Sequence, residues 1–96
     1  MMEIDKMATL STKHIQRETE RKLSEECYTN NMRLSVYEKE GYGFFIFIPD
    51  EEQFQSNHEI PEDLKNCMRV ASDNGCKWLC LDCDGPEHED LMEYEW

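Results

Sequence analysis

Three cysteines near the C-terminal end have a spacing that could bind a metal ion or an iron–sulfur cluster. Cys76, Cys80 and Cys83 follow the Cys-x-x-x-Cys-x-x-Cys pattern of radical enzymes, which hold a four-iron cluster on a loop. Here the intervening residues predict a strand, on which Cys80 and Cys83 project from opposite faces and cannot share a metal. The alternative is a zinc site of Cys83 and His88 with Cys76 or His58, although that spacing is not the one of zinc ribbons or fingers. We expect no metal ion and no cofactor.

Two aspartates at the end of the same apolar run could form a catalytic or cation-binding pair. Asp82-Cys83-Asp84-Gly85 is similar to the strand-end Asp-x-Asp-Gly of haloacid-dehalogenase-type phosphatases, where the carboxylates act as nucleophile and general acid. Those enzymes need a lysine from further along the chain, and none follows Gly85. A turn with aspartate at its favoured positions is the simpler interpretation, and we expect no enzymatic activity. The alternative is a small metal-dependent catalytic domain that uses Asp82, Asp84 and His14.

The pattern of apolar residues predicts that these side chains are positioned by one α+β domain spanning residues 1–96. Strands are predicted at 7–10, 34–38, 44–48, 77–81 and 93–96, the second and third forming a hairpin. Ser11 or Thr12 could cap a helix that continues to about Tyr28, and Pro61 starts a second helix that ends at Gly75. The order is β-α-β-β-α-β-β, a mixed sheet of four to five strands with two helices on one face. We expect residues 50–60 to be a loop and residues 1–6 to be disordered.

The predicted sheet has more apolar surface than two helices can cover. In the run 44–48, alternate side chains point to opposite faces, so Phe45 and Phe47 lie on the face without helices, together with Trp78 of the next strand. An exposed apolar face of this kind usually marks an interface. We expect a partner or a second subunit to cover it, and the alternative is that loop 50–60 or the N-terminal segment folds over it.

The negative charge of the chain is concentrated towards its C-terminus. The net charge is −12, and the last fifteen residues contain seven carboxylates and no lysine or arginine. Such a field attracts basic surfaces and repels nucleic acids and anionic membranes. The acidic residues are Asp82, Asp84, Glu87, Glu89, Asp90, Glu93 and Glu95. We expect these acidic residues to bind a protein with a basic surface. The most specific form of this hypothesis is that they mimic nucleic acid. The alternative is that they form a solvated face that aids solubility.

The cellular location can be predicted from whether the sequence contains a membrane-spanning segment or a secretory signal. No apolar stretch approaches the roughly 20 residues that a membrane span requires. The mixed-charge N-terminus lacks the apolar region of a secretory signal, and five cysteines are an odd number for a closed disulfide framework. We therefore expect a cytoplasmic protein that makes no contact with a membrane.

Three sequence blocks together resemble a known protein family. They are Leu10-Ser11-Thr12-Lys13-His14-Ile15, Gly43-Phe44-Phe45-Ile46-Phe47-Ile48-Pro49, and Asn74-Gly75-Cys76-Lys77-Trp78-Leu79-Cys80-Leu81-Asp82 with the ending Leu91-x-x-Tyr94-x-Trp96. The blocks resemble small bacterial proteins of unknown function found on phages, plasmids and other mobile elements. The resemblance implies a binding role, such as inhibition of a host-defence protein, and singles out Thr12, His14, Asp82 and Trp96. A homodimeric accessory protein without catalytic activity is a further alternative.

Overall fold

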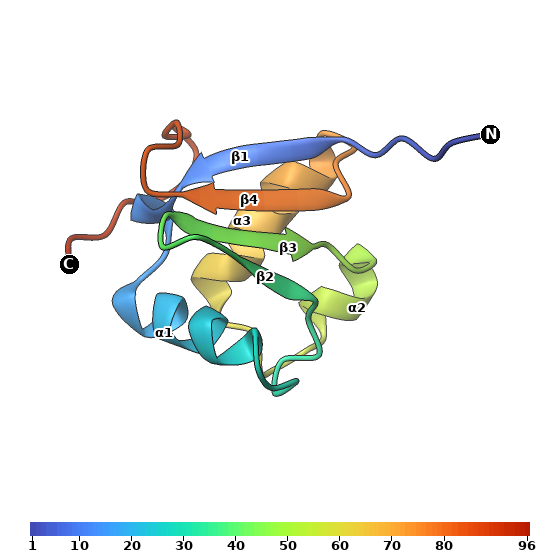
Figure 1. The fold of residues 1–96 in the computed structure, drawn as a ribbon. Helices are drawn as coiled ribbons and strands as arrows, with labels where there is room; N and C mark the ends of the chain where they lie inside the picture. The colour runs from blue at the N-terminus through green and yellow to red at the C-terminus, as the bar shows by residue number, and fades with distance from the viewer.

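The last strand in the sequence lies inside the sheet, because the four strands pair in the order β1-β4-β3-β2 (Figure 1). The computed structural model describes residues 1–96, and its strands are β1 (Met7–Ser11), β2 (Val36–Lys39), β3 (Gly43–Phe47) and β4 (Trp78–Asp82). β1 and β4 are parallel, whereas β3 runs antiparallel to both β4 and β2. The predicted mixed sheet of an α+β fold is confirmed.

The turn between β2 and β3 has the geometry of a tight β-hairpin. Glu40 and Gly41 have positive φ values of 40° and 82°, and the Tyr42 N–H donates to the Lys39 carbonyl oxygen at 2.7 Å. Two consecutive residues with positive φ give a turn whose twist matches that of the strands it joins. The predicted hairpin is confirmed.

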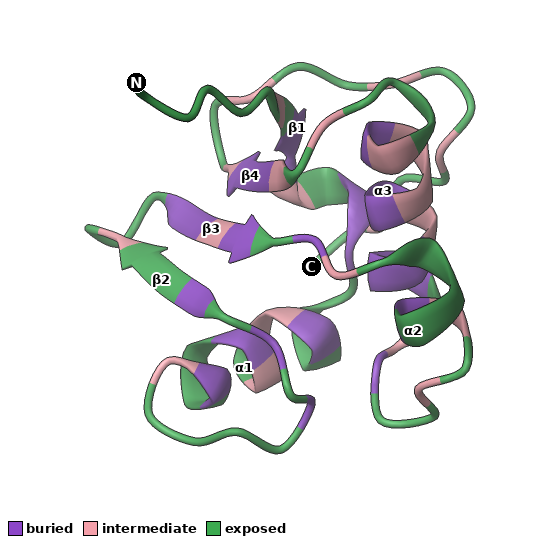
Figure 2. Ribbon diagram, turned by 90° about the vertical axis from the view of Figure 1, so that its right-hand side faces the viewer, coloured by how far each residue is buried: buried purple, intermediate pink, exposed green.

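Helices lie on one side of the sheet only (Figure 2). The longest, α3 (Glu62–Asp73), passes behind the strands in Figure 1, and α1 (Arg17–Glu26) and the short α2 (Glu51–Gln55) lie beside it. The apolar stripe of α3 belongs to the same buried core as Leu79 and Leu81 of β4. The members of that stripe are Leu64, Cys67, Met68 and Ala71. This packing leaves the opposite face of the sheet without a second layer.

The predicted start of the first helix, directly after Ser11 or Thr12, is wrong. The Ser11 hydroxyl oxygen does accept a hydrogen bond from the Lys13 N–H at 3.1 Å, but it caps only the 3₁₀ turn η1 (Thr12–His14). The backbone of Ile15 and Gln16 is extended, and α1 begins at Arg17. The Gln16 N–H donates to the Asp63 carboxylate at 2.7 Å, so a contact with α3 takes the place of a continuous helix.

Two further predictions are corrected by the structure. The predicted loop 50–60 contains α2, which buries Phe54 in the core and is a third helix. Residues 93–96 form no strand, although Glu and aromatic residues alternate there. The Tyr94 N–H donates to the Lys13 carbonyl oxygen at 2.8 Å, so this segment bonds to η1 and does not join the sheet.

Replacing Gly43 by alanine is expected to destabilise the protein strongly. A Cβ atom at this position would lie 1.7 Å from the Leu81 carbonyl oxygen of the neighbouring strand. Because relief requires the β3–β4 backbones to separate, we expect a loss of about 3 kcal/mol or more in the free energy of unfolding, measured by urea denaturation. Gly41→Asn is the control, since nothing lies within 4 Å of a Cβ there and asparagine tolerates positive φ. Equal stability of the two variants would contradict this close approach.

Candidate functional site

The uncovered side of the sheet presents a cluster of four aromatic residues, here called the aromatic face: Tyr37, Phe45, Phe47 and Trp78. The Trp78 ring packs edge-on against Phe47 with a centroid distance of 5.3 Å, and lies 6.2 Å from the Tyr37 ring. Tyr37 and Phe47 are 57% and 38% exposed, while Phe45 and Trp78 are half-buried. The structure thus places Phe45, Phe47 and Trp78 on the face where the sequence predicts them. It adds Tyr37, which sequence reasoning missed and which the alternation of Val36 and Tyr37 could have predicted.

Neither of the two segments that could have covered the aromatic face lies over it. The stretch 50–60 packs on the helix side, where Phe54 and Ile60 are part of the core. Residues 1–6 are exposed and precede the start of β1; Lys6 bonds to the backbone of Asn74 and Trp78, and the chain before it extends away from the sheet (Figure 1). Within this chain the aromatic face is therefore open to solvent.

An ion pair lies at the other end of the same face. The β-sheet register aligns Lys39, Gly43 and Asp82 on three neighbouring strands, and the absence of a side chain at Gly43 lets Lys39 reach across to Asp82. The Lys39 ammonium also lies 5.6 Å from the centre of the Phe45 ring. The hydrogen bond from Lys39 lowers the pKa of Asp82, helped by the Asp84 N–H, and in return raises the pKa of Lys39. Sequence reasoning missed this pair, because it depends on the register.

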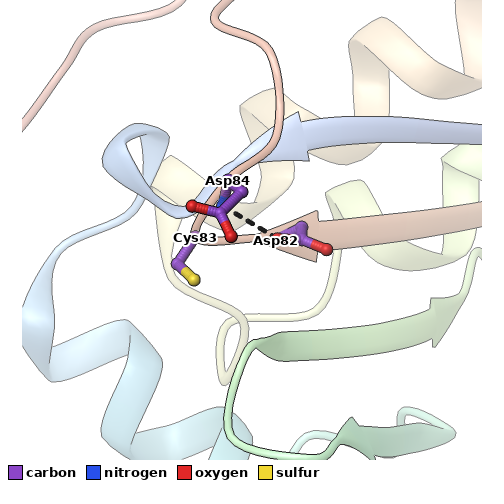
Figure 3. A group of neighbouring side chains, drawn as sticks. All are labelled: Asp82, Cys83 and Asp84. Carbon is purple, nitrogen blue, oxygen red and sulfur yellow. Dashed lines mark hydrogen bonds between the residues drawn. The ribbon is translucent and has the colours of Figure 1, made fainter.

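The turn after β4 brings together the three groups that could ligate a cation (Figure 3). Ligand atoms of Asp82, Cys83 and Asp84 lie within 4.8 Å of one another. One oxygen of Asp82 accepts a hydrogen bond from Lys39 and the other accepts one from the Asp84 N–H at 2.8 Å. Each oxygen of Asp82 therefore already accepts a hydrogen bond within the fold, and Cys83 and Asp84 are exposed.

The groups of the alternative zinc site are not brought together. Cys76 precedes β4 and Cys83 follows it, so the length of a strand separates the two thiols. The Nδ1 atom of His88 accepts a hydrogen bond from the Asp90 N–H at 3.1 Å. Burial raises the pKa of the Cys80 thiol, which lies within β4. The cluster of potential ligand atoms around Cys83 contains Asp82 and Asp84 but neither Cys76, His58 nor His88.

His14 holds the acidic tail, residues 83–96, against the body of the protein. The residue is 2% exposed; its Nδ1 atom lies 2.9 Å from the Met92 carbonyl oxygen, and its Nε2 atom lies 2.8 Å from the backbone nitrogen of His88. A carbonyl oxygen can only accept and an N–H can only donate, so these partners assign the neutral imidazole with its proton on Nδ1. Both ring nitrogens are thus used structurally, and neither is free for acid–base chemistry.

Three further hydrogen bonds attach the tail to residues 11–15. They run from the Ser11 N–H to the Pro86 carbonyl (2.8 Å), from the Tyr94 N–H to the Lys13 carbonyl (2.8 Å), and from the Trp96 indole N–H to the Ile15 carbonyl (3.0 Å). The N-terminal and C-terminal blocks singled out in the sequence therefore form one structural unit, in which Thr12 is half-buried. The sequence showed both blocks but not that they touch.

Most acidic side chains of the tail have no positively charged partner. The Lys13 ammonium lies 3.0 Å from the Glu87 carboxylate; this contact lowers the pKa of Glu87 and raises that of Lys13. Asp82, at the base of the tail, pairs with Lys39. The other five are exposed and form no ion pair: Asp84, Glu89, Asp90, Glu93 and Glu95. Two lysines from other parts of the chain, Lys13 and Lys39, therefore form ion pairs with residues of a region, 82–96, that contains no lysine or arginine.

The fold and these surfaces define a small α+β domain with one open sheet face and an acidic tail. None of its helices is long and apolar enough to cross a membrane. The chain belongs to a family of unknown function: the family described as "Family of unknown function (DUF5983) C-terminal domain" matches residues 7–96. The match extends from the first residue of β1 to the end of the tail. Comparisons with curated proteins and with solved structures found no match.

Replacing His14 by alanine is expected to release the tail without unfolding the sheet. The His88 N–H loses its acceptor, and each lost hydrogen bond is worth about 1 kcal/mol. We expect the amide hydrogens of His88 and Tyr94 to exchange at least several times faster, while amides of β3 and β4 stay protected. His58→Ala is the control, because His58 is exposed and lies outside the tail contacts. Unchanged exchange in the tail would contradict the role of His14.

Replacing Lys39 by methionine is expected to raise the pKa of Asp82 towards its usual value. In the folded protein this pKa is lowered, so the ion pair stabilises the fold above the unfolded-state pKa, and that stabilisation is lost as pH falls through the folded-state value. An NMR titration of the Asp82 carboxyl carbon measures the shift. Lys13→Met is the matched control, which should raise the pKa of Glu87 and leave Asp82 unchanged. An Asp82 pKa that does not rise in Lys39→Met would show that the ion pair does not set it.

Proposed function

We propose that this protein is a non-catalytic interaction protein whose aromatic face binds a partner protein with a basic surface. The observation that carries the proposal is the exposed Tyr37–Trp78–Phe47 cluster on a sheet face that no part of the chain covers. Tyrosine and tryptophan are enriched among the residues that dominate binding energy at protein interfaces. A rigid sheet presents such side chains at little cost in conformational entropy.

The charge of the protein supports a basic partner. The net charge is −12, and five carboxylates of the tail are exposed and unpaired. Such a field accelerates encounter with a basic surface and disfavours nucleic acids, anionic membranes and a second equally charged copy. It argues for a heterologous partner over a homodimer.

The sharpest version of the proposal is mimicry of nucleic acid. In that version Asp84, Glu89, Asp90, Glu93 and Glu95 occupy a basic groove of a DNA-binding or host-defence protein, and Asp82 and Glu87 contribute less because lysines already neutralise them. The context would be a mobile element in a bacterial cytoplasm, where the five free cysteines stay reduced. A catalytic role for Asp82, Asp84 and His14 is less well supported, because the groups of Asp82 and His14 are hydrogen-bonded within the fold.

The aromatic face can be tested with Tyr37→Ser/Phe47→Ser against the control Tyr28→Ser/Tyr42→Ser, which removes two exposed tyrosines from other surfaces. Each variant is immobilised and used to capture proteins from bacterial lysate. We expect the first variant to lose a partner that the wild type and the control both retain. Equal capture by all three would contradict the proposal. Self-association of the wild type, lost in the same variant during sedimentation, would instead assign this face to a second copy.

The role of charge needs a separate pair of variants. Glu89→Lys/Asp90→Lys/Glu95→Lys reverses three acids of the tail, and Glu3→Lys/Glu51→Lys/Asp73→Lys makes the same change in net charge elsewhere. We expect only the tail variant to weaken binding of the captured partner, with affinity that falls steeply as salt rises. Displacement of the protein by duplex DNA would support mimicry, and simultaneous binding of DNA and protein to the partner would exclude it.

A further inference from the structure

A polar hollow lies on the helix side of the molecule, away from the aromatic face. It has a volume of about 840 Å³ and is formed by the end of α1, the loop 31–34 and the connection between α2 and α3. This size is within the range of small-molecule sites, roughly 300–1,000 Å³. Its polar lining includes Lys22, Arg33, His58, Gln53, Glu25 and Glu59. A lining of this kind suits a polar ligand.

Two basic side chains without a partner in the fold line the hollow, beside the three carboxylates of Glu25, Glu26 and Glu59. Seven of the ten lysines and arginines form an ion pair or a side-chain hydrogen bond, namely Lys6, Lys13, Arg21, Lys39, Lys65, Arg69 and Lys77. The three that remain are Arg17, Lys22 and Arg33. Two of these three, Lys22 and Arg33, line the hollow. Arg33 is exposed and Lys22 is half-buried, so both cations are accessible to a ligand in the hollow.

Arg33 is held in a conformation that favours glycine. Its φ is 56°, in the left-handed region, which costs a residue with a side chain about 1 kcal/mol or more. The buried carboxylate of Glu26 accepts hydrogen bonds from the N–H groups of Met32 and Leu34, the residues on either side of Arg33. The Asn57 amide donates to the Met32 carbonyl oxygen at 3.0 Å. The surrounding structure thus fixes a strained arginine at the hollow, and strain of this kind is found at binding sites.

We propose that this hollow binds a small zwitterionic ligand whose oxyanion, a phosphate or a carboxylate, is held by Arg33 and Lys22. A guanidinium matches the paired oxygens of either group, and the lysine adds a second positive charge. The carboxylates of Glu25 and Glu59 are exposed in the same lining and accept hydrogen bonds from an amino group of the ligand. They also repel a long polyanion, which separates this site from a nucleic-acid groove.

The proposal is tested by titrating the ¹⁵N-labelled protein with inorganic phosphate, phosphoethanolamine and L-glutamate. We expect phosphoethanolamine to shift the amide signals of residues 31–34 and 57–59 and to bind more tightly than inorganic phosphate, which lacks the amino group. L-Glutamate distinguishes carboxylate from phosphate recognition. Absence of saturable shifts at these residues with both phosphoethanolamine and L-glutamate would overturn the proposal.

Arg33→Gly separates a binding role from a structural one. Glycine adopts the left-handed conformation without strain, so we expect the melting temperature to stay equal or rise, while affinity for the probe that binds falls about tenfold or more. Arg17→Gln is the matched control, since Arg17 is the third unpaired base and does not line the hollow. An affinity in Arg33→Gly equal to that of the wild type would overturn the proposal.

Discussion

The rest of the structure depends on the position of β4 inside the sheet, where it pairs with β1 on one side and β3 on the other. Because successive side chains of a strand point to opposite faces, this register sends Leu79 and Leu81 into the core and leaves Trp78 on the open face. The Leu81 carbonyl oxygen lies so close to Gly43 that β3 has no room for a side chain there. The position of β4 therefore determines which side chains enter the core and which lie on the aromatic face, and its close approach to Gly43 leaves the space across which Lys39 reaches Asp82.

The acidic residues divide into those that hold the fold together and those that form its surface. Asp63 and Glu26 are 8% and 3% exposed, and each accepts several hydrogen bonds. The carboxylate of Asp63 accepts from the Gln16 N–H and the Thr19 hydroxyl, so it ties the start of α1 to α3, while Glu26 holds the loop 32–34. A buried carboxylate is tolerated where hydrogen bonds compensate its lost hydration. The field around the molecule therefore comes from the exposed acids, and those of the tail differ from the rest in having no lysine or arginine within their own segment.

The sequence predicts elements whose signal is local and misses those that depend on distant contacts. The helix at 62–73 has a full apolar stripe. The five consecutive apolar residues at 44–48 predict a strand with apolar side chains on both faces of the sheet, which also predicts Phe45 and Phe47 as site residues. In contrast, α2 is a single turn with one buried residue, too short for a periodic pattern. The alternation at 93–96 predicts a strand, but Tyr94 and Trp96 bond to the backbone of Lys13 and Ile15, about 80 positions away. Sequence spacing contains no information on that contact.

The arrangement of the two surfaces constrains any partner that uses both. Trp78 is the first residue of β4, and Asp82, immediately before the tail, is the last. Trp78 and Asp82 are separated by four residue steps, roughly 13 Å, and Phe45 pairs with Cys80 between them, so the aromatic face extends along the strand to the ion pair at the base of the tail. A protein–protein interface of ordinary size, about 800 Å² on each partner, spans that distance. A partner with an apolar pocket beside a basic groove could therefore engage the aromatic side chains and the tail together, with His14 keeping the tail in place for that contact.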